Sequence, residues 1–142
     1  MNGRPADFAD ACDRHWEDAE SLLVIERLAN ADQLFGLAAE CGLKCTMLRL
    51  GMNVDPEGVP AEKKHKVHID RLWDTFRSFA GDREGSRYAA QLPADNPFSD
   101  WSIHDRYAHR RHFAGEAVRS HRDGAAAVHE LRRGDEFAGS AP

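Results

Sequence analysis

The segment from Asn30 to Leu50 constrains the fold more than any other part of the chain. After Asn30 it reads ADQLFGLAAECGLKCTMLRL, so apolar residues cover most sides of a helix. Asn30 is suited to cap the start of this helix, and Gly51 is suited to end it in a left-handed turn. Room for neighbouring helices to approach closely is left by four small residues: Gly36, Ala38, Ala39 and Gly42. The pattern predicts a central helix that others surround.

Four further segments have helical character. Apolar residues recur at helical spacing over residues 6–26, 66–80 and 115–133. A short helical piece is expected over residues 84–91, before Pro93. The last helix is expected to close near Gly134. Residues 51–64 hold two prolines and two glycines and indicate a loop, and residues 94–107 indicate an irregular segment.

These elements predict an all-α fold, an antiparallel four- to five-helix up-and-down bundle. Residues 1–134 are expected to form this single domain, and residues 135–142 a frayed C-terminal tail. No segment favours a strand. Glu40 and Lys44 are one helical turn apart in the order that favours an ion pair.

The chain shows no signal for export or for a membrane. No apolar run approaches the roughly 18 residues that span a bilayer, and the N-terminus lacks the layout of a signal peptide. A cytoplasmic location is therefore predicted. The three cysteines, Cys12, Cys41 and Cys45, are expected to be reduced and packed in the core.

Basic residues concentrate in the C-terminal third, although the net charge is −5. The sequence between Trp101 and Arg133 contains seven arginines but only four acidic residues. The stretch DRYAHRRHF, residues 105–113, holds three of these arginines and two histidines. An anionic partner would meet this part of the chain first.

The chain resembles the HEPN superfamily of small helical bacterial domains. The resemblance rests on ANADQLFGLAAECGLKCTMLRLG, HIDRLWDTF and FSDWSIHDRYA, of which LFGLAAECGLK is the most specific part. It spans roughly residues 10–133. It implies a homodimeric helical bundle, often encoded beside a nucleotidyltransferase or within a defence or toxin–antitoxin system, with no cofactor.

Many members of that superfamily cleave RNA without a metal, through an arginine and a histidine four to six residues apart near the start of the last long helix. The resemblance implies this catalytic role for Arg106 and His112, which five residues separate. Histidine suits proton transfer near neutral pH, and arginine suits contact with a phosphate. His109, Arg110 and Arg111 would add contacts to the RNA phosphates.

Structural roles compete with these assignments. Tyr107 stands where the family often has a polar residue, and Gly115 suggests that the last helix starts beyond His112. Arg106 would then pair with an acid such as Glu40 or Asp105, with Tyr107 packed beneath it. His121 lies on the apolar face of the last helix, where a hydrogen-bonded core histidine is expected, and Glu40 is a candidate cleft residue.

Metal binding is the weaker interpretation of three groups of residues. Cys41 and Cys45 share a helical face, His65 and His68 are three residues apart, and His104, His109 and His112 share the basic stretch. We expect core packing for the cysteines, a polar first turn for His65 and His68, and no bound metal.

Three functions follow from these observations. The first is a metal-independent endoribonuclease, and the second is a non-catalytic homodimeric module that binds a partner protein, a nucleotide or RNA. The third is an interaction domain whose basic segment is merely solvated. Nucleotidyltransferase or antitoxin partners belong to the first two.

Overall fold

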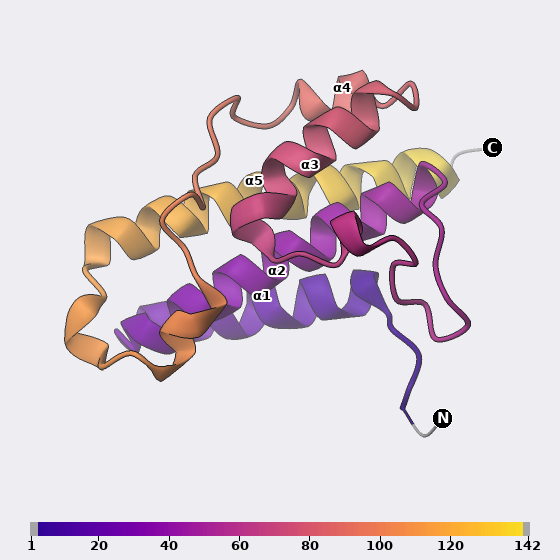
Figure 1. Ribbon diagram of the computed structural model, residues 1–142. Helices are drawn as coiled ribbons and strands as arrows, with labels where there is room; N and C mark the ends of the chain where they lie inside the picture. Colours follow the sequence, from indigo (N-terminus) through magenta and orange to yellow (C-terminus); the bar gives the residue numbers. More distant parts are fainter. Residues whose placement is uncertain (1–2, 141–142) are drawn as a thin grey trace.

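The protein is all-helical, as the sequence predicts. The computed structural model describes the backbone of residues 3–140 and the side chains of residues 3–134. Its elements in chain order are α1 (Phe8–Val24), α2 (Leu28–Arg49), η1 (Lys63–His65), α3 (Ile69–Gly81), α4 (Ser86–Ala89), η2 (Ile103–Tyr107), η3 (Arg110–His112) and α5 (Gly115–Ser140), where η marks a 3₁₀ helix (Figure 1). Among the described residues, β pairing is limited to one isolated bridge between Val54 and Pro60.

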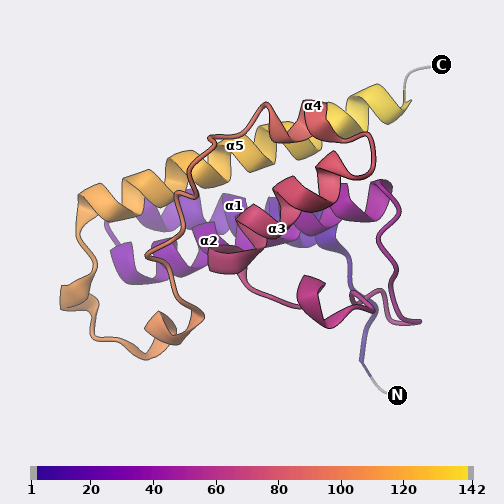
Figure 2. The same ribbon diagram turned by 45° about the horizontal axis from the view of Figure 1, so that its top comes forward.

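The central position of α2 is confirmed. It packs against α1, α3 and α5, and both views show it between these helices (Figures 1 and 2). Two of its small residues make this possible: a side chain on Gly36 would overlap the Trp101 indole, and one on Gly42 would overlap Val128 of α5. The largest fully buried apolar side chains are Trp73, Phe35, Phe76, Phe98, Leu43, Met47, Ile69 and Leu72.

The helices do not alternate in direction as a simple up-and-down bundle would. α1 runs against α2, whereas α3 and α5 advance in the same direction as α2 (Figure 1). The reason lies in two long returns. Residues 50–68 bring the chain back to the middle of α2, where His68 contacts Glu40, and residues 90–114 bring it back to the start of α2.

Several helix ends differ from the sequence prediction. α2 begins at Leu28, with Arg27 rather than Asn30 at the cap position. The chain reaches this earlier start through Glu26, whose φ of 59° lies in the left-handed region. α1 is capped by Asp7, whose carboxylate accepts a hydrogen bond from the Asp10 amide. α3 starts three residues later than expected and α4 is a single turn.

The prediction that the last helix closes near Gly134 is wrong. α5 continues to Ser140, so residues 135–140 are helical rather than a frayed tail, and residues 141 and 142 lie outside the described part of the chain. A glycine inside a helix costs only about 1 kcal/mol, which the neighbouring helical residues outweigh.

Within the described residues, no helix has both the length and the apolar character needed to cross a membrane. The cysteines are free thiols. Burial raises the pKa of Cys12 and of Cys41 to about 12, so neither thiol ionises readily at neutral pH. This state fits core packing better than metal ligation.

Candidate functional site

The segment between α4 and α5 is anchored to the helices by its own polar groups. The side-chain Nδ2 of Asn96 donates to the backbone carbonyl of Asp70 at 2.8 Å. The side-chain Oδ1 of Asn96 accepts from the backbone N–H of Phe98, also at 2.8 Å. The second of these bonds forms an Asx turn, a conformation that suits the sequence Asn96-Pro97. Phe98 is then buried against Trp73.

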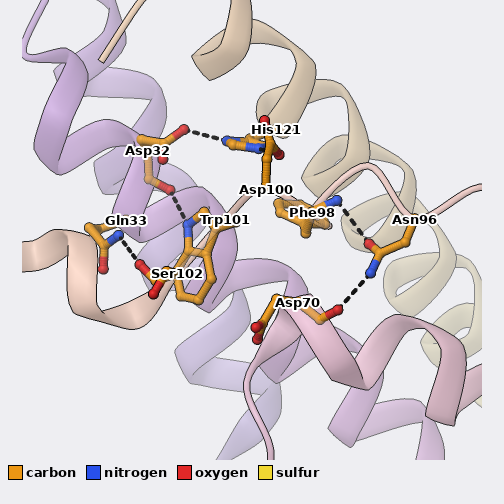
Figure 3. Close-up of polar contacts among 9 residues, drawn as sticks. All are labelled: Asp32, Gln33, Asp70, Asn96, Phe98, Asp100, Trp101, Ser102 and His121. Atoms are coloured by element: carbon orange, nitrogen blue, oxygen red, sulfur yellow. Dashed lines mark hydrogen bonds and ion pairs between the residues drawn. The ribbon is translucent and has the colours of Figure 1, made fainter. Parts of the chain in front are cut away.

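Two further hydrogen bonds join the segment to α2. The Trp101 indole donates to the Asp32 carbonyl at 3.0 Å, and the Gln33 amide donates to the Ser102 carbonyl at 2.9 Å (Figure 3). Trp101 lies against Gly36, the position where a larger residue would not fit. These contacts fix the direction in which the segment between α4 and α5 passes from α2 into η2.

His121 is a buried, hydrogen-bonded histidine, as the sequence predicts. Its Nδ1 contacts the Asp32 carboxylate at 2.5 Å and its Nε2 contacts the Asp100 carboxylate at 2.7 Å, while its ring stacks on Phe98 (Figure 3). Burial alone lowers the pKa of His121, but the hydrogen bonds and charges of Asp32 and Asp100 outweigh it and raise the pKa. The imidazolium thus bridges α2 and the anchored segment.

The basic stretch forms two short 3₁₀ helices and not the start of the last helix. Arg106 lies on η2, donates to the Ile103 carbonyl at 2.6 Å, and stacks over the Tyr107 ring at 4.3 Å. The predicted packing of Tyr107 beneath Arg106 is therefore confirmed. His109 caps η3, because its Nδ1 accepts from the Arg111 amide at 3.1 Å.

A cavity of about 500 Å³ lies between this stretch and the start of α2. Arg106, His109 and Arg110 line one side of it. The other side is formed by the α1–α2 turn and the first turns of α2. The lining residues from that side are Glu26, Arg27, Leu28, Ala29, Asn30 and Gln33, and the loop adds Asp105, Ala108 and Phe113. In both ribbon views the loop lies at this end of α2 (Figures 1 and 2).

The predicted catalytic pair is not brought together around the cavity. Arg106 lines it, whereas His112 and Arg111 are exposed and are absent from its lining. A different histidine, His109, shares the cavity with Arg106 and Arg110. Because the backbone amide of Arg111 can only donate, the neutral His109 ring holds its proton on Nε2.

Glu40 lies elsewhere and has structural partners. It accepts from Lys44 at 3.0 Å, which confirms the predicted ion pair, and contacts His68 Nδ1 at 2.9 Å. The alternative in which Glu40 pairs with Arg106 is wrong. His65 is buried against Phe79 and not part of a polar first turn, and burial lowers its pKa. Among the described residues, no group of three or more His, Cys, Asp or Glu side chains is arranged to hold a metal.

Sequence reasoning missed the half of the cavity that α2 supplies. Arg27, Asn30 and Gln33 recur at three-residue spacing on one side of the helix start, which was a usable signal. The predicted helix begins at Asn30, which leaves Arg27 outside it. No side chain caps the start of α2. Residues of its first turn, at the positive end of the helix dipole, line the cavity.

Comparisons with family models, curated proteins and solved structures found no match to this chain.

Proposed function

We propose that this protein binds single-stranded RNA, with a phosphate in the cavity between α2 and the η2–η3 stretch. The observation that supports this best is the shared cavity: Arg106 and Arg110 from the loop lie opposite Arg27 and the uncapped start of α2. Guanidinium groups and a helix N-terminus both favour phosphate. A volume of about 500 Å³ is in the range of sites for one small ligand, such as one nucleotide.

The charge around the cavity favours RNA binding that is confined to the cavity and of modest affinity. Glu26 and Asp105 also line it, so three arginines are partly offset by two carboxylates. The net charge of the chain is −5, which disfavours a wide nucleic-acid surface. We therefore expect RNA to contact the protein chiefly at the cavity and to bind less tightly as salt concentration rises.

Kinship with the HEPN superfamily is part of this proposal, and so are a homodimeric state, a cytoplasmic location and a nucleotidyltransferase or antitoxin partner. Its support is the all-α fold and the basic stretch placed directly before α5. Metal-independent RNA cleavage is the second candidate function. What favours it is that Arg106 and His109 line one cavity, a cation for the phosphate beside a proton-transfer group.

The test is RNA binding, followed by fluorescence anisotropy of a short labelled single-stranded RNA in chelator. We expect Arg106→Ala and Arg110→Ala each to weaken binding about tenfold, as for loss of one charge-assisted contact. Arg71→Ala, which removes an exposed arginine of α3 outside the cavity, is the matched control and should bind as the parent does. Equal binding by all four proteins, or no binding by the folded parent, would contradict the proposal.

Gel analysis of the same samples tests cleavage. The second candidate predicts products from the parent, no products from His109→Ala, and unchanged products from His112→Ala. Loss of the products only in His112→Ala would instead support Arg106 and His112 as the catalytic pair.

A further inference from the structure

Gln33, one of the residues that line the cavity, carries a buried polar atom without a hydrogen-bond partner in the described part of the chain. Gln33 is 8% exposed, and its side-chain amide donates through Nε2 to the Ser102 carbonyl. Its Oε1 is buried and has no hydrogen-bond partner among the described residues. Because the Ser102 carbonyl can only accept, the amide cannot be turned over, and the oxygen must be the free end.

An unpaired buried acceptor is stabilised by a donor, so a ligand that pairs with Gln33 has to present an N–H or O–H group. The oxygens of an ionised phosphate only accept, so a phosphate at the arginines does not satisfy Gln33. The complementary group is an N–H or O–H elsewhere on the same ligand. Gln33 is about one and a half turns beyond the first residue of α2, so it is separated along the helix from the proposed phosphate position.

The apolar residues of the lining favour the base as the part of a nucleotide that lies beside Gln33. Leu28, Ala29 and the half-buried Phe113 line the same cavity as Gln33. A nucleobase is the flat, apolar part of a nucleotide, and proteins that bind single strands stack such bases on aromatic side chains. The base edge, and not the sugar–phosphate backbone, would then approach Gln33.

We propose that Gln33 is a specificity residue that accepts a hydrogen bond from the amino group of a nucleobase held in this cavity. The inference rests on the proposed RNA binding and adds which bases are preferred. Oε1 is covered in the free protein, so the base pairs with it after a small shift of a neighbouring side chain. The preference arises because a base without the amino group leaves the acceptor unpaired in the complex.

The ligand itself supplies the first test. Binding of the unmodified full-length protein is compared for two short RNAs: one of adenosine, and one in which each adenine is replaced by purine, which lacks only the amino group. We expect the adenosine RNA to bind about tenfold more tightly. Equal affinities would overturn the role of Gln33 and leave RNA binding intact, whereas no binding to either RNA would overturn the proposed function.

Two variants separate base selection from loop anchoring. Gln33→Met keeps the length of the side chain and removes the acceptor, and it should bind both RNAs with equal affinity. It also loses the bond to Ser102, so the control is Trp101→Phe, which loses the neighbouring bond to the Asp32 carbonyl. Trp101→Phe should weaken the binding of both RNAs by the same factor and keep the preference for the adenosine RNA. A preference that persists in Gln33→Met overturns the inference.

Discussion

At the scale of single residues, His121 shows how a polar group is tolerated in this core. The ring is 4% exposed, and each nitrogen meets a carboxylate, one on α2 and one on the segment before η2. Asp32 is almost fully buried, whereas the Asp100 side chain is 68% exposed. The buried charge of Asp32 is thus compensated by the imidazolium, and removal of the ring would leave it unpaired.

His121→Asn should lower the free energy of unfolding by about 3 kcal/mol near pH 6. The folded state raises the pKa of His121, so its stabilising contribution is complete below about pH 6.5 and is lost as pH rises through the raised pKa. The difference between parent and variant should therefore shrink toward about pH 9. Urea unfolding at both pH values measures it.

His104→Asn is the matched control, because His104 is exposed on η2. Its stability should stay within about 0.5 kcal/mol of the parent at both pH values. A gap between parent and His121→Asn that grows with pH would contradict the assigned sign.

At the scale of elements, the contact between Gly36 of α2 and Trp101 positions the whole η2–η3 stretch. The indole occupies the space that any side chain at position 36 would need. The same segment is held by Gln33 and His121 within a few residues. The position of the stretch that lines the cavity therefore depends on Gly36 together with these hydrogen bonds.

Gly36→Ala should destabilise the protein by about 2 kcal/mol, since overpacking shifts the indole, and should weaken RNA binding with it. Gly134→Ala is the control. A Cβ at position 134 meets nothing among the described residues, and alanine favours the helix, so this variant should gain up to about 1 kcal/mol. Thermal unfolding and RNA anisotropy of both variants measure these effects. A Gly36→Ala protein with the stability of the parent would refute the packing argument.

At the scale of the whole molecule, polar ties hold α1 against α5. Asp13 contacts the buried Arg132 at 2.5 Å and His129 at 3.1 Å, and His129 stacks on Trp16. Nearer the cavity, Glu20 makes a two-pronged pair with Arg122 at 2.8 and 2.9 Å. These helices are far apart in sequence, so the ties stabilise the assembled domain rather than any single helix.

Asp13→Ala should therefore destabilise the domain by about 3 kcal/mol, because Arg132 would lose a charged partner in a buried position. Glu20→Ala should cost only about 1 kcal/mol, because both members of its pair are about a third exposed. Chemical unfolding of the two variants compares them directly. A larger loss in Glu20→Ala would contradict this ranking.

Much of the fold was predictable from local pattern, and the site was predictable only in part. Helical periodicity identified α2 as the centre, and charge counting located Arg106, His109 and Arg110. The partners of these arginines were not predictable, because Arg27 and Gln33 approach them through a loop closure of some 70 to 80 residues. Spacing along the chain also favoured His112, although Arg111 and His112 are exposed outside the cavity and its lining resumes only at Phe113.

The sequence by itself determined that this protein is helical, that α2 is its central helix and that Glu40 pairs with Lys44, because each depends on residues within a few turns. Only the tertiary structure decided that α3 and α5 run with α2, that His121 bridges two carboxylates, and that the basic stretch faces the start of α2. Those features depend on long-range packing around Gly36 and Trp101, which local propensity does not encode.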